Sequence, residues 1–280
     1  MNKMKILIPT DFSLQAEYAW ILARKINEKI PSEIHFVHVL NVPETVEQTE
    51  SGNITTCGDI SPASMQRLYD DANLKLKEFK EKKFPTAESH ILLGKITERI
   101  VEFARSKKFD VIIMGTKGEE KFRDKISGTE AQHVVRKSDI PVLTVRCDRS
   151  SSDLTNILFV HDFNVEEKFD ISLMKKIQSA FGSKVILLHI FNDEKEELKK
   201  SAIEQKMREY ADKEGLSNYE IHFIRDRDVE LGVFHFDQMH STDLVCIGTH
   251  GKGSLIYASI AEKLVNHMFK PLLTFRIYDK

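Results

Sequence analysis

The sequence predicts an α/β protein made of two tandem doubly wound domains, each built on a five-stranded parallel sheet. The first observation is an internal repeat: ILIPTDFS (6–13) matches ILFVHDFN (157–164), and SEIHFVHVLN (32–41) matches SKVILLHIFN (183–192). Further along, DVIIMGTKG (110–118) matches DLVCIGTHG (243–251), and PVLTVR (141–146) matches PLLTFR (271–276). The second observation is that short runs rich in Val, Ile and Leu alternate with longer amphipathic stretches, as βαβ units require.

The offset between the two copies indicates where they differ. It is 151 residues at the first two matches, 133 at the third and 130 at the fourth. The second copy therefore lacks a long segment after its second strand and three residues after its glycines. A Ser-rich polar run at 147–155 lies between two apolar strands, as a short linker should. We expect one domain over 1–148 and a second over 154–280.

The elements of the first copy follow from their hydrophobic patterns. Strands are predicted near 4–9, 33–40, 88–93, 110–114 and 141–146. A helix with Ala16, Ala19, Trp20 and Ala23 on one face is expected after strand one, with Ser13 as its N-cap. Because such crossovers are right-handed, a ligand is expected at the carboxyl ends of the strands.

Two further helices are predicted from capping signals and apolar spacing. One begins at Thr97 and turns Ile100 and its apolar neighbours inward. In the second copy, Asn164 and Glu167 have capping-box spacing ahead of Met174.

Composition excludes several classes of function. The chain has 280 residues, of which 41% are hydrophobic and 30% charged, and its net charge is -2. It therefore has no general electrostatic attraction to nucleic acid or to an anionic membrane. No apolar run approaches the ~20 residues of a membrane span, and the three cysteines are far apart. We expect a cytoplasmic protein with neither nucleic acid nor a membrane as partner.

Glycines concentrate in two loops. Six of the 12 glycines lie in these two loops, three after the fourth strand of each copy. In the first copy, Gly115 and Gly118 are followed by nine residues and then by Gly128 and Thr129, where a helix is expected. Backbone amides of such a loop can turn toward an anion, and a helix N-terminus adds unpaired N–H groups. The alternative is that these glycines serve only the tight turn.

The pattern G-x2-G-x9-G-[S/T], in a domain that opens with ILIPTDFS, resembles the universal stress protein family in its ATP-binding branch. The resemblance covers both halves, closely in the first and more loosely in the second. It implies a Rossmann-like fold of the adenine nucleotide alpha hydrolase type and a regulatory, ATP-binding role in the stress response. A nucleotide-free dimerisation or scaffold module of the same fold is the alternative.

The resemblance also implies which residues meet the adenosine end of the nucleotide. Pro9, Thr10 and Asp11 would lie against it, and Val39 would meet the adenine edge. Without the resemblance, Asp11 could equally be a carboxylate that caps a helix or ends a strand.

The same resemblance places the ribose and the phosphates beside the glycine loop. Met114 and Gly115 would line the ribose, Gly118 and Gly128 would surround the phosphates, and Thr129 would contribute its hydroxyl. The expected ligand is ATP, with AMP or ADP as alternatives and Mg²⁺ as an accompanying ion.

Two residues depart from the family pattern. Lys117 stands where many relatives have histidine and adds positive charge. Glu130 follows the hydroxyl residue, and its carboxylate would oppose a phosphate unless it turns away.

The second copy has an altered loop. Ala258 aligns with Gly128 and Ser259 with Thr129, and six residues replace the nine of the first loop. We expect weak or absent ATP binding there. The candidate residues of this weaker site are Asp162, Gly248, Gly251 and Ser259.

No residue pattern predicts catalysis. The P-loop and the nucleophile elbow are both missing, so ATP hydrolysis is expected to be slow if it occurs. No metal site is predicted, because His235 and His240 are five apart and do not share a helix face.

Two expectations concern assembly and access to the ligand. The resemblance implies that the last strands of the two copies, PVLTVR and PLLTFR, pair within the chain as a pseudo-dimer, in the way that relatives pair theirs in two-fold dimers, and a further homodimer is possible. The polar segment 42–64 is either a lid or a floppy insertion.

Overall fold

The computed structural model describes residues 3–49, 52–57, 60–117, 130–161, 163, 168–250 and 255–278. The strands of the first half are β1 (Met4–Pro9), β2 (Ser32–Leu40), β3 (Val46–Gln48), β4 (Ile54–Thr56), β5 (Glu88–Leu93), β6 (Val111–Gly115) and β7 (Val142–Val145). Its helices are α1 (Leu14–Lys29), α2 (Pro62–Lys83), α3 (Ile96–Ser106) and α4 (Glu130–Lys137).

The second half repeats this order. Its strands are β8 (Asn156–Val160), β9 (Lys168–Phe169), β10 (Lys184–Phe191), β11 (Tyr219–Arg225), β12 (Leu244–His250) and β13 (Leu272–Tyr278). Its helices are α5 (Ser172–Phe181), α6 (Glu194–Glu197), α7 (Lys200–Glu214), α8 (Val229–Met239) and α9 (Leu255–His267). The five strands expected in the first copy are confirmed to within one or two residues.

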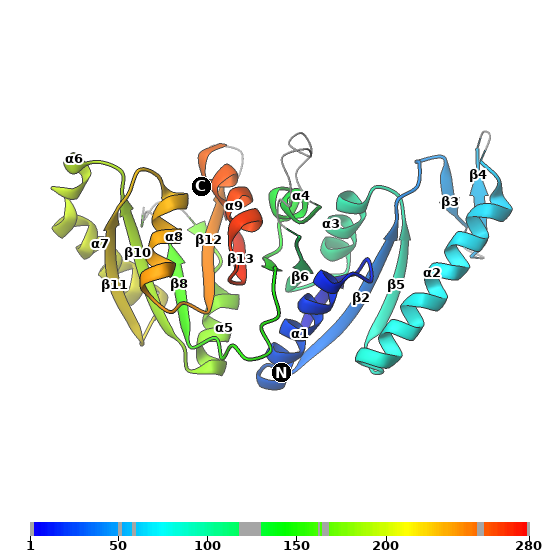
Figure 1. The fold of residues 1–280 in the computed structure, drawn as a ribbon, viewed down its shortest axis with the longest axis horizontal. Helices are drawn as coiled ribbons and strands as arrows, with labels where there is room; N and C mark the ends of the chain where they lie inside the picture. The colour runs from blue at the N-terminus through cyan, green and yellow to red at the C-terminus, as the bar shows by residue number, and fades with distance from the viewer. Residues whose placement is uncertain are drawn as a thin grey trace.

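One continuous sheet crosses the molecule, in the order β11-β10-β8-β12-β13-β7-β6-β1-β2-β5 (Figure 1). Within each half the five main strands are parallel, with the first strand at the centre. The chain runs outward from β1 through β2 to β5 and then returns to β6 on the other side of β1. The two doubly wound, Rossmann-like sheets predicted from the sequence are therefore present.

The halves meet where β7 and β13 pair antiparallel. Leu143 lies opposite Leu273, and two threonine hydroxyls reinforce the seam. Thr274 Oγ1 donates to the carbonyl of Val142 at 3.2 Å, and Thr144 Oγ1 donates to that of Leu272 at 3.4 Å. The expected pairing of the last strands is confirmed, and it leaves β5 and β11 as the edges of the sheet.

Helices cover both faces of the sheet, and the apolar layers are continuous from one half to the other. One layer holds α1, α2, α5 and α7 through Trp20, Leu76, Met174 and Met207. The opposite layer holds α3, α4, α8 and α9 through Ile100, Val134, Val233 and Leu264. The hydrophobic cluster of each of these two layers contains side chains of both halves, so the seam is part of the core.

The structure corrects two expectations about local elements. In the described part of segment 42–64, β3 and β4 form a hairpin whose Val46 and Ile54 pack with Ala72 of α2, instead of the floppy insertion that was one of the two expectations. The helix containing Met174 begins at Ser172, with no side-chain cap. Asn164 and Glu167, which we expected to cap it, precede that start and lie outside the described residues.

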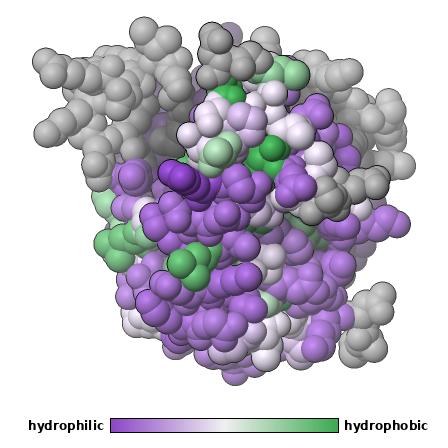
Figure 2. All heavy atoms as spheres, turned by 90° about the vertical axis from the view of Figure 1, so that its right-hand side faces the viewer, coloured by the Kyte–Doolittle hydropathy of each residue, from purple (hydrophilic) through white to green (hydrophobic). Residues whose placement is uncertain are grey.

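The end of the molecule that carries β5, α2 and the hairpin is shown in Figure 2. Hydrophilic side chains predominate on the coloured part of this face, and hydrophobic ones are scattered singly. Over the ranges that the structure describes, no helix combines the length and the apolar character needed to cross a membrane.

Candidate functional site

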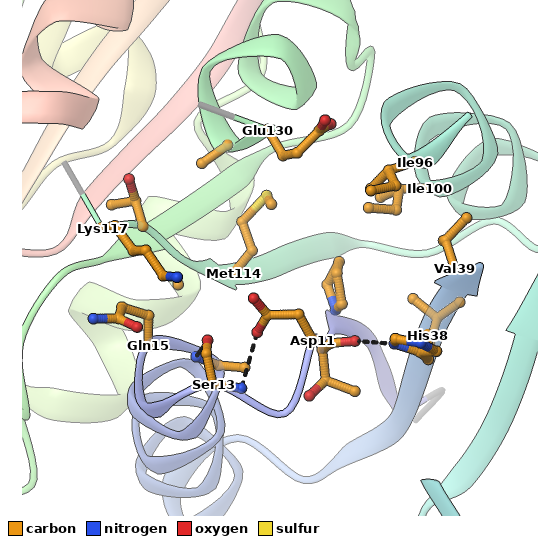
Figure 3. Close-up of a pocket in the computed structure, with 17 residues that line it drawn as sticks. Asp11, Ser13, Gln15, His38, Val39, Ile96, Ile100, Met114, Lys117 and Glu130 are labelled. Carbon is orange, nitrogen blue, oxygen red and sulfur yellow. Dashed lines mark hydrogen bonds between the residues drawn. The ribbon is translucent and has the colours of Figure 1, made fainter. Parts of the chain in front are cut away.

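A cavity of about 280 Å³ opens at the carboxyl ends of β1, β2 and β6 (Figure 3). It lies where the chain direction switches sides of β1, because β2 and β6 flank this strand. Ligands of open α/β sheets bind at such a switch point. Residues from α1, α3 and α4 complete the wall.

The loop between β1 and α1 forms one rim of the cavity, and its own side chains hold its shape. Asp11 Oδ1 accepts the backbone N–H of Ser13 at 3.0 Å, and Thr10 Oγ1 accepts that of Phe12 at 3.0 Å. Phe12 has a φ of 64°, a left-handed conformation that these turns sustain. Ser13 itself caps α1 by accepting from Ala16. Asp11 is therefore not the helix cap, and the bond to Ser13 uses only one of its two carboxylate oxygens.

His38 on β2 fastens the same loop from the opposite side. Its Nδ1 donates a hydrogen bond of 2.7 Å to the carbonyl of Thr10. Its ring packs against that of Phe12, with 4.7 Å between the ring centroids. Since a carbonyl only accepts, Nδ1 carries the proton. In the neutral ring, Nε2 is then an acceptor.

Gly115 at the end of β6 allows the close approach of α1. A Cβ atom at this position would overlap the carbonyl group of Gln15. The first turn of α1 therefore lies directly against the end of β6. Its unpaired backbone N–H groups make this side of the cavity electropositive.

The wall opposite Asp11 is apolar. Val39 of β2, Ile96 and Ile100 of α3 and Met114 of β6 line it, and Ile100 and Met114 are almost fully buried. A slot with apolar walls and a carboxylate at one end is suited to a flat, partly polar ligand.

Charged side chains stand around the mouth of the cavity. Figure 3 shows Asp11 and Lys117 extending from opposite walls toward one another. The Glu130 carboxylate points instead toward α3, where the Thr97 hydroxyl donates to it at 2.5 Å. This contact meets the condition under which Glu130 leaves room for an anion.

Seven of the residues expected from the sequence come together in this cavity: Pro9, Thr10, Asp11, Val39, Met114, Gly115 and Lys117. The remaining three, Gly118, Gly128 and Thr129, lie outside the described residues. Sequence reasoning had not assigned to the site the following lining residues: Ser13, Gln15, Ala16, Val37, His38, Ile96, Ile100, Thr116, Glu130 and Ala131. For His38 a signal existed, because it directly precedes Val39 on the strand. No described residue of segment 42–64 lines the cavity, so the hairpin does not act as its lid in this conformation.

The corresponding part of the second half is built differently. His161, which aligns with Thr10, is buried beside the rings of Phe159, Phe163 and Tyr210. Gly248 lies within β12 and not after it, and Asp162 and Gly251 fall outside the described residues. Ser259 is the fifth residue of α9. Its backbone N–H therefore does not belong to the four unpaired groups that begin a helix.

The first half also contains a cluster that the sequence analysis missed. His35 of β2 and Glu88 and His90 of β5 bring possible metal-ligand atoms within 4.8 Å of one another. No metal site was expected, because only the histidines of the second half had been compared. The register of β2 against β5, which the sequence does not give, brings these side chains together.

Comparison with known proteins assigns the family. A model of the Universal stress protein family matches residues 3–146. Universal stress protein MJ0531 of Methanocaldococcus jannaschii is 30% identical over 142 residues, which cover 51% of this chain and 81% of that protein. Universal stress protein MJ0577 of the same organism is 28% identical over 153 residues, which cover 51% of this chain and 94% of that protein.

A solved structure extends the likeness to the whole fold. The match to the structure of a universal stress protein from Archaeoglobus fulgidus covers 99% of this chain and 99% of that chain. The TM-score is 0.75 and the sequence identity 17%. At this identity the likeness concerns the fold alone. The fold, the motif and the family match agree, and the chain belongs to the universal stress protein family.

Proposed function

We propose that the first half of this protein, residues 1–148, binds an adenine nucleotide of the ATP class, and that occupancy of the site regulates the protein. The observation that carries the proposal is the cavity at the switch point, where Asp11 faces an apolar slot. A nucleobase fits between aliphatic side chains, and ribose hydroxyls are donors that a carboxylate accepts.

The size and charge of the cavity support a nucleoside inside it and phosphates beyond it. A volume of about 280 Å³ is at the lower end of small-molecule sites. The phosphates would pass Lys117, which supplies a positive charge at the mouth. Gly118, Gly128 and Thr129 follow in the sequence and match the family motif. Mg²⁺ would accompany the triphosphate.

In this proposal the second half, residues 154–280, supports the structure of the first half and has weak or no affinity for ATP. Its aligned side chains support the asymmetry. Ile190 replaces the smaller Val39, and Gly232 of α8 aligns with Arg99 of α3. The Ile190 side chain occupies the space beside Gly232, since a Cβ there would lie 2.8 Å from Ile190 Cγ2.

Regulation fits this architecture better than rapid catalysis. Among the described lining residues, Asp11 would in this proposal face the ribose, and Glu130 points toward α3 and accepts from Thr97, so neither carboxylate is placed beside the phosphates as a general base. Any hydrolysis of ATP is expected to be slow and incidental to binding.

The alternative is a nucleotide-free scaffold. The continuous sheet and the hydrophobic clusters shared by both halves favour it, because they hold the chain together without a ligand. Calorimetric titration of nucleotide-free protein with Mg-ATP separates the two functions. We expect about one site per chain in the wild type, no binding by Gly118→Val, and unchanged binding by Gly251→Val. Absence of heat from the wild type would favour the scaffold, and equal loss in both variants would overturn the asymmetry.

A further inference from the structure

A second cluster of chemically active side chains lies at the edge of the same half. His35 on β2 is paired in register with Glu88 on the edge strand β5, and His90 follows two residues later on the same face. Val39, at the candidate nucleotide site, is four residues further along β2. At about 3.3 Å per residue, the two places are about 13 Å apart.

Three atoms of this cluster form a small triangle. His35 Nδ1 lies 3.0 Å from His90 Nε2. Glu88 Oε2 lies 3.4 Å from the first nitrogen and 3.6 Å from the second. With metal–ligand distances of 2.0–2.2 Å, tetrahedral zinc holds its ligand atoms about 3.4 Å apart. The triangle therefore has nearly the dimensions of one face of a zinc coordination sphere.

The neighbours of the triangle orient its ligand atoms. His35 Nε2–H donates a hydrogen bond of 2.8 Å to Glu33 Oε1, which leaves the lone pair of the neutral ring on Nδ1, facing the triangle. Carboxylates hold metal-binding histidines in this way. The His35 ring also rests against Phe109 and the His90 ring against Phe103, each at 4.8 Å between centroids.

Burial is graded across the three side chains. The exposed fraction of the side chain is 7% for His35, 26% for His90 and 61% for Glu88. An ion could enter from the solvent side, and a fourth position would stay open to water. Without an ion, the two rings are joined by a hydrogen bond in which His90 Nε2–H donates to His35 Nδ1.

We propose that His35, Glu88 and His90 bind a divalent cation of the zinc type, with three protein ligands and water in the fourth position. Two imidazoles and one carboxylate suit Zn²⁺ and its first-row neighbours rather than Mg²⁺ or Ca²⁺, which prefer oxygen ligands alone. The ion would join the edge strand β5 to β2 in addition to their backbone hydrogen bonds.

The second half provides a natural control for this proposal. Glu220 and His222 on β11 occupy the places of Glu88 and His90, but the residue paired with Glu220 is Ile186 instead of a histidine. The second half thus has the glutamate and the histidine of the edge strand but lacks the histidine on the neighbouring strand.

The test is a calorimetric titration of the full chain with ZnCl₂ after treatment with EDTA, in the absence of nucleotide. We expect one Zn²⁺ per chain, and Co²⁺ at the same site should show the visible absorption of a four-coordinate ion. His90→Gln, at a half-buried position, and Glu88→Gln, at an exposed one, should each weaken binding by at least tenfold. Glu33→Gln should weaken it by about tenfold through the orientation of His35.

The matched control is His222→Gln, which should leave zinc binding unchanged. Circular dichroism of each variant verifies that it is folded. Absence of zinc binding by the wild type would overturn the proposal, and so would His90→Gln binding zinc as the wild type does. Neither result depends on whether the protein binds ATP.

Discussion

His38 donates a hydrogen bond of 2.7 Å from its Nδ1 atom to the carbonyl oxygen of Thr10. The bond joins the end of β2 to the loop that carries Asp11, so two walls of the cavity are held by one contact. The position of Asp11 therefore depends on a side chain of the neighbouring strand.

Replacement of His38 by phenylalanine tests this dependence. The ring would still pack on Phe12, but the Thr10 carbonyl would lose its partner. We expect the free energy of unfolding to fall by about 1–2 kcal/mol and the affinity for adenosine to fall as well. Urea unfolding and calorimetry measure the two effects. His189→Phe, at the aligned position of the second half, should leave adenosine affinity as it is; a loss there equal to that of His38→Phe would contradict this account.

Gly115 is required by the contact between β6 and α1. In Gly115→Ala, the added methyl would overlap the Gln15 carbonyl, and α1 would have to move. We expect unfolding to become easier by about 1–3 kcal/mol, as for other overpacked positions. In the control Gly52→Asn, the backbone is left-handed, nothing lies within 4 Å of the new Cβ, and asparagine tolerates this conformation. Equal stability of Gly115→Ala and the wild type in urea would show that the close approach is not real.

Lys117 and Glu130 should have opposite effects on the binding of phosphates. Removal of the positive charge in Lys117→Gln is expected to weaken ATP binding roughly fivefold, since two unit charges 4 Å apart in water interact by about 1 kcal/mol. Removal of the negative charge in Glu130→Gln is expected to strengthen it by a similar factor, and the amide can still accept from Thr97. Adenosine, which carries no phosphate, serves as the control ligand. If both variants changed adenosine affinity as much as ATP affinity, the effect would not come from charge.

The seam between β7 and β13 should make the two halves unfold together. Trp20 is the one tryptophan of the chain and is buried in the first half, whereas circular dichroism reports both halves. The two signals should follow one urea transition. Leu143→Ala, at the buried centre of the seam, should shift both by about 2–5 kcal/mol. Separate transitions for fluorescence and circular dichroism would contradict a shared core.

Much of the fold could be predicted from the sequence, because buried parallel strands are short apolar runs that the repeat marks twice. The pairing of PVLTVR with PLLTFR was expected from the family resemblance, because the repeat supplies two copies of the last strand. The β3–β4 hairpin was missed because its strands have three residues each and hardly any apolar alternation. The late start of α5 was missed because a local capping pattern does not show that β9 pairs with β13 instead.

The candidate site was predictable where a motif marks it and not where register decides. Asp11 and Gly115 belong to recognisable sequence patterns. Ile96 and Ile100 come from a helix that only the packed fold brings over the cavity. His35 and His90 are 55 positions apart and meet solely through the register of β2 and β5.

The most direct test of the central claim is a crystal structure of the protein grown with Mg-ATP. We predict adenosine density in the cavity of the first half, with the ribose against Asp11, the base between Val39 and Met114, and the phosphates leading past Lys117. An empty cavity at saturating nucleotide, or nucleotide bound in the second half alone, would contradict the account.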